Sequence, residues 1–141
     1  MITVRLEYDN TEKPDVNESW VRSVCENILM DSNQDEASIT FIFSNDDKLR
    51  RLKKEYFGED VFTDTISFNL EEDGDPIDGE IYISLNRVST NAREFKQNTG
   101  RELKRVIIHG LLHLLDYDDQ TLEEKKAMTC LEDHYLNQPV V

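Results

Sequence analysis

Apolar and polar side chains alternate with two different periods along the first half of the chain. Residues 2–8 alternate one by one, as in a strand with one buried face. Residues 17–30 carry apolar side chains at helical spacing: Trp20, Val21, Val24, Ile28 and Leu29. Residues 37–43 are mostly β-branched or aromatic. SNDD, 44–47, is a helix-start signal, and residues 47–57 have a helical pattern that ends at Gly58. This half predicts a strand, a helix, a strand and a helix, in that order.

The second half predicts a pair of strands followed by helices. Residues 63–69 and 80–85 have strand character, and the Gly, Pro and Asp residues between them favour a turn between neighbouring strands. From about residue 87 the pattern is helical with one interruption, and a last helix covers 121–136. About four strands and five helices in mixed order predict an α+β fold, with helices packed on a mixed sheet. The length suits a single domain, 1–141.

The composition indicates what kind of protein this is, but it does not indicate which reaction or ligand is involved. Hydrophobic residues make up 38% of the chain, and no stretch approaches the roughly 18 apolar residues that a membrane span requires. The opening residues, MITVRLEYDN, lack the basic and apolar segments of a secretion signal, so we expect a cytoplasmic protein with no membrane partner. Cys25 and Cys130 have no paired spacing and are expected to be free thiols.

The formal net charge of −14 is unfavourable for a nucleic-acid-binding protein, because affinity for phosphate backbones comes largely from lysine and arginine. The cations are nevertheless clustered in two places: Lys48, Arg50, Arg51, Lys53 and Lys54, and then Arg101, Lys104 and Arg105. Two interpretations are open. The clusters form a basic strip on an acidic body, or they are solvated helix faces that balance neighbouring carboxylates. Without further observations the second is favoured.

Two of the three histidines lie four residues apart in the apolar run IIHGLLHLLDYDDQ, 107–120. Positions i and i+4 share one helix face, so His109 and His113 can direct both imidazoles at one point. Imidazole binds Zn²⁺ and its transition-row neighbours, and a catalytic zinc site usually has three protein ligands and an open position. The alternative is a structural pair that caps carbonyls or fills space.

Three features favour a metal site over the structural alternative. The surrounding leucines and isoleucines make this helix apolar nearly all round, and unpaired imidazoles are costly in such a core. Gly110 costs about 1 kcal/mol in a helix interior, which indicates that another group passes close to the backbone there. The acidic turn DYDD, 116–119, can bend back over the helix face.

At HGLLHLLDYDD the sequence resembles the YbeY family of bacterial endoribonucleases, whose pattern His-Gly-x-x-His-Leu-x-Gly-Tyr-Asp-His contains three zinc-binding histidines. TDTISF at 63–68 is similar to the family's Thr-Asp-Val-Leu-Ser-Phe, and GEIYIS at 79–84 is similar to its Gly-Asp-Ile-x-Ile. The resemblance covers most of the chain. It implies an α+β fold and a metal-dependent endoribonuclease acting on single-stranded RNA. It also implies roles in maturing the 3′ end of small-subunit ribosomal RNA and in ribosome quality control.

The resemblance implies Asp119 as the third ligand beside His109 and His113, because Asp119 stands where the family has its third histidine. Carboxylate oxygen binds zinc at a distance similar to imidazole nitrogen but lowers the net charge of the site by one. We therefore expect one Zn²⁺ ion that is a weaker Lewis acid here than in a site of three histidines. The harder ions Mn²⁺ and Mg²⁺ are the alternatives. Asp116, at a family glycine, and Asp118 are expected to be solvated turn residues. A ligand role for Asp116 and a supporting role for Asp118 are the alternatives.

The catalytic residues do not follow from the histidine pattern itself. The family's arginine after the tyrosine of its second helix is replaced here by Phe57, and phenyl cannot stabilise developing phosphate charge. A cation of 50–54, with Arg50 and Arg51 as the candidates, reaches the site instead, or the enzyme is slow, or it no longer cleaves RNA. Asp64 is the candidate general base or supporting carboxylate, with a turn-capping role as the alternative.

The expected partners are single-stranded RNA, small-subunit ribosomal RNA or the ribosome, and a ribosomal protein. The alternative function is a ribosome-associated binding protein in which a structural metal holds the helix and turn together with little catalysis. An open metal position would separate the two, because structural zinc sites are closed by protein ligands. Gly110 stands where HExxH metalloproteases place their glutamate, which argues against that class. His134 is expected to be a solvated helix cap.

Overall fold

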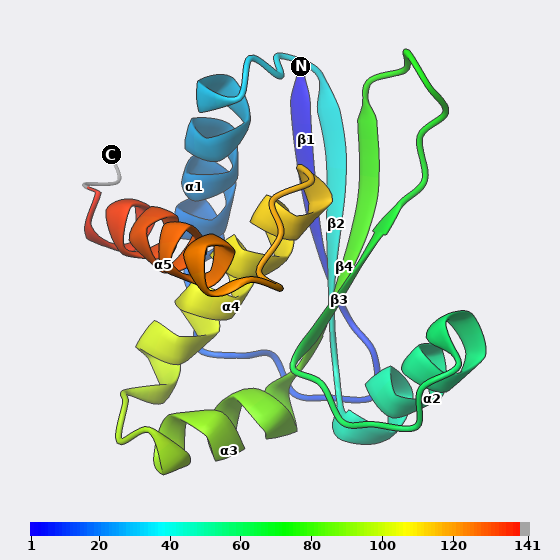
Figure 1. Cartoon of the computed structure of the whole chain (residues 1–141), viewed down its shortest axis with the longest axis vertical. Helices are drawn as coiled ribbons and strands as arrows, with labels where there is room; N and C mark the ends of the chain where they lie inside the picture. The colour runs from blue at the N-terminus through cyan, green and yellow to red at the C-terminus, as the bar shows by residue number, and fades with distance from the viewer. Residues whose placement is uncertain (139–141) are drawn as a thin grey trace.

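Four strands form one mixed sheet in a computed structural model that describes residues 1–138 (Figure 1). The strands are β1 (Ile2–Tyr8), β2 (Ala37–Ser44), β3 (Thr65–Asn69) and β4 (Ile77–Ser84). Their order is β1-β2-β4-β3, with β1, β2 and β4 parallel and β3 antiparallel to β4 at the sheet edge. The predicted α+β fold with about four strands and five helices is confirmed within these residues.

The five helices begin at side chains that cap their free amide groups. They are α1 (Glu18–Asp31), α2 (Asp46–Phe57), α3 (Leu85–Glu94), α4 (Thr99–Leu114) and α5 (Leu122–Asn137). The capping residues are Asn17, Asn45, Ser84, Asn98 and Thr121, each of which accepts a hydrogen bond from a first-turn amide. These local signals explain why the helix starts could be read from the sequence to within a few residues.

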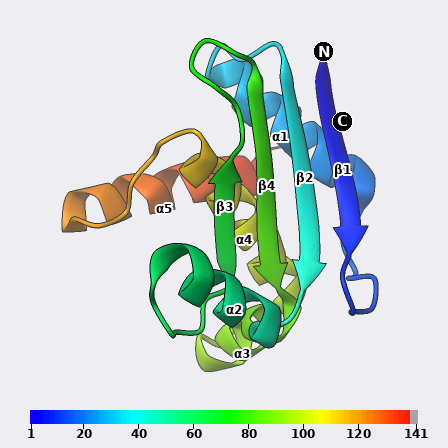
Figure 2. The ribbon, with the colours of Figure 1, turned by 90° about the vertical axis from the view of Figure 1, so that its right-hand side faces the viewer.

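The two faces of the sheet are covered unequally. Figure 2 shows α1, α4 and α5 behind the sheet and α2 in front of its lower end. The main core lies between the sheet and the helices behind it, where Phe41 and Ile81 pack with Ile107 and Leu111. A smaller cluster under α2 consists of Leu49, Leu52 and Ile66. The helix with both histidines therefore lies in the main core.

Helix α4 approaches the sheet most closely at a glycine. A Cβ atom on Gly110 would lie 2.7 Å from Cγ2 of Ile81 and 3.1 Å from Oγ1 of Thr65. The Ser67 hydroxyl donates a hydrogen bond to the Gly110 carbonyl at 2.8 Å. The prediction that another group passes close to Gly110 is confirmed, and that group is the sheet itself.

Two other expectations concern the whole described chain. None of the helices within residues 1–138 has the length and apolar character needed to cross a bilayer. Cys25 is buried, Cys130 is exposed, and both are free thiols, as predicted.

Candidate metal centre

Helix α4 and the turn after it bring three ligand atoms together. His109 Nε2 and His113 Nε2 lie 2.9 Å apart, and Asp119 Oδ2 lies 3.5 Å from each of them. Tetrahedral Zn²⁺ with bonds of about 2.0 to 2.2 Å separates its ligand atoms by roughly 3.3 to 3.6 Å. The two distances to Asp119 fall in this range and the distance between the imidazole nitrogens is slightly shorter, so the three atoms form a candidate site for one divalent ion.

Asp119 returns to the histidines because the backbone reverses at Asp116. Asp116 has φ 70°, in the left-handed region that aspartate tolerates better than most residues. The reversal is fixed by hydrogen bonds from the Asp116 amide to the His113 carbonyl at 3.0 Å and from the Tyr117 amide to the Leu112 carbonyl at 3.1 Å. The side chains of Asp116 and Asp118 are exposed, as expected of turn residues. The conformation of Asp116 also explains why glycine suits this position in the family pattern.

A buried carboxylate holds His109 from the side opposite the cluster. Glu132 on α5 is 6% exposed, and its Oε2 accepts a hydrogen bond from His109 Nδ1 at 2.6 Å. Arg105 donates to Glu132 Oε1 at 2.8 Å and to Asp133 Oδ1 at 2.6 Å. Because Nδ1 donates to a carboxylate, Nε2 keeps its lone pair directed at the cluster. Burial opposes protonation of His109, but the hydrogen bond and charge of Glu132 outweigh burial and raise the pKa of the imidazole.

Glu132 was missed by reasoning from the sequence. It follows His109 by 23 residues and belongs to another helix, so no spacing rule connects the two. The one available signal was its place on the face of α5 that also buries Met128 and Tyr135, where an unpaired carboxylate would be costly.

Asp64 lies beside His109 in a cavity of about 300 Å³ between α4 and α5. The cavity is also lined by Arg105, Asp119, Lys125 and Glu132. Burial raises the pKa of the Asp64 carboxyl, while the charge of His109 opposes the rise. Asn91 on α3 donates to Asp64 Oδ2 at 3.4 Å, a long hydrogen bond. The structure thus brings Asp64 to the same cavity as two of the three ligand candidates.

Comparison with known proteins identifies the family. The family model described as Endoribonuclease YbeY matches residues 4–139. The chain belongs to this family. An endoribonuclease YbeY from Chlorobaculum tepidum is 40% identical over 93% of this chain and 95% of its own length. One from Flavobacterium psychrophilum is 41% identical over 84% of this chain and 81% of its own.

A solved structure has a similar fold. The solution structure of TM1509 from Thermotoga maritima has a TM-score of 0.60 at 28% sequence identity. The match covers 96% of this chain and 87% of that one. The fold of this YbeY-family chain is therefore shared by an experimentally determined structure.

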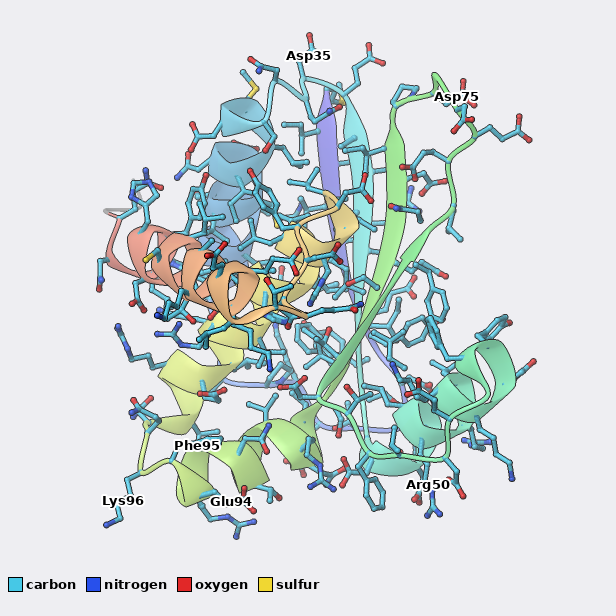
Figure 3. The ribbon with its side chains drawn as sticks, in the orientation of Figure 1. Asp35, Arg50, Asp75, Glu94, Phe95 and Lys96 are labelled. Carbon is cyan, nitrogen blue, oxygen red and sulfur yellow. The ribbon has the colours of Figure 1, made fainter. Side chains whose placement is uncertain are left out.

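Arg50 and Arg51 lie apart from the cluster, on α2. Figure 3 shows Arg50 at the outer side of α2, away from α4 and α5. Its guanidinium donates to Asp60 Oδ1 at 2.5 Å and to Oδ2 at 3.2 Å, while Arg51 Nε donates to the Asp47 carbonyl at 3.4 Å. Neither arginine lines the cavity beside His109. The structure does not bring them to the ligand candidates, and their catalytic role stays a prediction.

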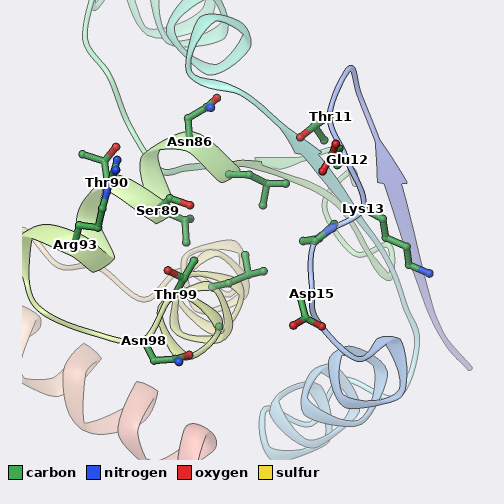
Figure 4. Close-up of a pocket in the computed structure, with 15 residues that line it drawn as sticks. Thr11, Glu12, Lys13, Asp15, Asn86, Ser89, Thr90, Arg93, Asn98 and Thr99 are labelled. Carbon is green, nitrogen blue, oxygen red and sulfur yellow. The ribbon is translucent and has the colours of Figure 1, made fainter.

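Two further features lie outside the cluster. A larger cavity, of about 720 Å³, lies between residues 11–15, α3 and the first turn of α4, and Ser89, Arg93 and Thr99 are among its lining residues (Figure 4). This cavity shares no lining residue with the one beside His109. His134, in the last turn of α5, packs edge-on against the Tyr135 ring and is not part of the cluster.

Proposed function

We propose that the protein is a metal-dependent endoribonuclease that cleaves single-stranded RNA. Membership of the endoribonuclease YbeY family supports the reaction, and the cluster of two imidazoles and a carboxylate beside a cavity supports its location. The cluster is the observation that carries the proposal, because its three donor atoms lie close enough together to bind one ion after a shift of a few tenths of an ångström between the two imidazoles.

The proposed metal is a single Zn²⁺ ion held by His109, His113 and Asp119, with Mn²⁺ and Mg²⁺ as alternatives. Three protein ligands are typical of catalytic zinc sites, whereas structural sites usually have four. The three side chains are 25%, 30% and 35% exposed, so the cluster is accessible from solvent. When bound, the ion supplies Lewis-acid stabilisation of phosphate charge and lowers the pKa of water.

The protein's own groups position the reactants and handle the proton. Asp64 has a partly buried carboxyl with a raised pKa, which suits it to accept a proton from the attacking water or from the substrate's 2′-hydroxyl. Glu132 keeps the His109 ring oriented through its Nδ1 hydrogen bond. Arg105 holds Glu132 in place from the other side.

The cellular role that we propose follows the family resemblance. The substrate would be the 3′ region of small-subunit ribosomal RNA, and the protein would act in ribosome maturation and quality control in the cytoplasm. The ribosome or a ribosomal protein would be its partner.

The test is cleavage of a labelled single-stranded RNA by the wild type and by His113→Ala, purified identically and supplied with Zn²⁺ or Mn²⁺. We expect cleavage by the wild type that disappears in the variant and on addition of a chelator. The paired variant controls for contaminating nucleases. Equal cleavage by both proteins would contradict the proposal. A wild type that binds metal but does not cleave would favour the alternative, a binding protein with a structural metal.

A further inference from the structure

The cavity beside His109 is a groove between one face of α4 and one face of α5. On α5 it is lined by Lys125, Met128, Thr129 and Glu132. Their spacing of i, i+3, i+4 and i+7 places all four on one side of the helix. A rise of about 1.5 Å per residue separates Lys125 from Glu132 by about 10 Å along the axis. Glu132 contacts His109, while Lys125 lies in the second turn of α5, closer in sequence to Asp119.

Carboxylates outnumber the lysine and arginine side chains that line this groove. Asp64, Glu102, Asp119 and Glu132 face two cations, Arg105 and Lys125. The proposed ion would offset the charge of Asp119 at the cluster, but the other carboxylates still repel an RNA backbone along the groove unless a protein cation is free to pair with a phosphate. The available cation must therefore be found among the two.

Arg105 is already paired with two carboxylates. Its two terminal nitrogens donate to Glu132 and Asp133 at 2.8 and 2.6 Å, and a phosphate could recruit it only by releasing the carboxylate that holds His109. Lys125, by contrast, has no carboxylate within 4.0 Å of its ammonium group among residues 1–138. Of the two groove cations, only Lys125 is free to bind an anion.

We propose that Lys125 is the phosphate-binding cation of this groove and pairs with a non-bridging oxygen of the bound RNA at or next to the scissile phosphate. The inference rests on the proposed endoribonuclease function and adds the residue that engages the substrate backbone. The inference places the phosphate-binding cation on α5, within the groove, and not on α2, where the family pattern has its arginine. Phe57, which occupies the position of the family arginine, is 48% exposed on α2 and packs against Phe68 and Lys53.

Lys126 provides a matched control. It is the adjacent lysine on the same helix and is exposed, but it does not line the groove. Lys125→Ala and Lys126→Ala therefore change the net charge of the protein and the composition of α5 identically. Lys125→Arg keeps the positive charge at the groove. A competition assay with a chromophoric chelator checks that all variants bind Zn²⁺ as the wild type does.

The experiment measures binding of Zn²⁺-loaded protein to a fluorescent 2′-O-methyl single-stranded RNA over a range of salt concentrations, and kcat/KM on unmodified RNA. We expect Lys125→Ala to weaken binding and lower kcat/KM about tenfold at low salt, mainly through KM. The slope of log affinity against log salt should fall by about 0.7, the loss of one phosphate contact on a single strand. Lys125→Arg should recover most of both effects, and Lys126→Ala should stay within about twofold of the wild type.

Equal affinity, slope and kcat/KM for Lys125→Ala and Lys126→Ala would overturn the inference and leave the proposed function standing. A wild type that binds RNA but does not cleave it would overturn the proposed function, while the binding measurements would still decide the role of Lys125. A wild type that neither binds nor cleaves RNA would overturn both.

Discussion

The groove between α4 and α5 and the surface of α2 both carry several charged side chains, but the cations of the two regions differ in whether they are already paired. In the groove, Glu132 binds His109 and Arg105, which leaves the cluster's donor atoms and Lys125 available. On α2, Arg50 is paired with Asp60, and Lys53 is paired with Glu59. The number of cations in a segment therefore says less about binding than whether those cations already have partners.

Two arginines, one on α2 and one on α3, contact the segment that precedes Asp64. The guanidinium carbons of Arg50 and Arg87 lie 5.2 and 4.7 Å from the centre of the Phe62 ring. Arg87 also pairs with Asp46 at 3.0 Å. Phe62, two residues before Asp64, therefore contacts arginines of both α2 and α3, and neither of these helices lines the groove.

Among variants that compare the groove with the α2 side, the largest loss of activity is expected at Asp64. Asp64→Asn should lower kcat by about 10²- to 10⁴-fold, because it removes the proposed proton acceptor. Asp60→Asn is the matched control on the α2 side, since Asp60 is exposed and paired with Arg50. Steady-state cleavage of single-stranded RNA measures the difference, and similar kcat values for the two variants would contradict the role of Asp64.

The same substitution should stabilise the metal-free protein at neutral pH. Burial raises the pKa of Asp64 in the folded state, so ionisation opposes folding at pH values above that raised pKa. Wild-type stability should therefore rise as pH falls through the folded pKa of Asp64, and Asp64→Asn should lack this component. Thermal unfolding of both proteins across the acidic range tests the sign, and a lower Tm for the variant at pH 7 would contradict it.

Removal of the carboxylate that orients His109 should have the next largest effect. Glu132→Gln is expected to weaken Zn²⁺ affinity about 10- to 100-fold, as is typical when a partner of a ligating histidine is lost. Asp133→Asn is the control, because Asp133 also binds Arg105 but does not contact His109. Chelator competition gives both affinities, and equal values would show that Glu132 does not tune the site.

A smaller effect is expected where α4 meets the sheet. Gly110→Ala should destabilise the fold by about 1 to 2 kcal/mol, because overpacking against Ile81 outweighs the gain in helix propensity. Urea unfolding measures the change. A stabilised variant would mean that the sheet yields at this point and that the close approach is not required.

The smallest effect is expected at Arg50. Its contacts in the structure predict that Arg50→Ala changes kcat/KM by less than about twofold, because it pairs with an exposed carboxylate outside the groove. Arg51→Ala should behave in the same way. A loss of tenfold or more in either variant would support the catalytic role predicted from the sequence and break the contrast between the two regions.

The sequence was most informative where residues that act together are close along the chain. The i, i+4 spacing of His109 and His113 indicated a metal site, and the resemblance to the YbeY pattern added Asp119 to it. The helical cost of Gly110 pointed to the contact with the sheet. Glu132 and Lys125 could not be found in this way, because helix packing decides which faces of α4 and α5 meet. Nor could the ion pair of Arg50, which depends on the path of the chain after α2.

Titration of metal-depleted protein with Zn²⁺, followed by bound metal and by RNA cleavage together, tests the central claim most directly. The wild type and Asp118→Ala should both gain cleavage activity that saturates at one ion per chain, whereas Asp119→Ala should bind the ion far more weakly and recover little activity. Equal titrations for Asp119→Ala and Asp118→Ala, or cleavage that does not depend on bound metal, would contradict the account.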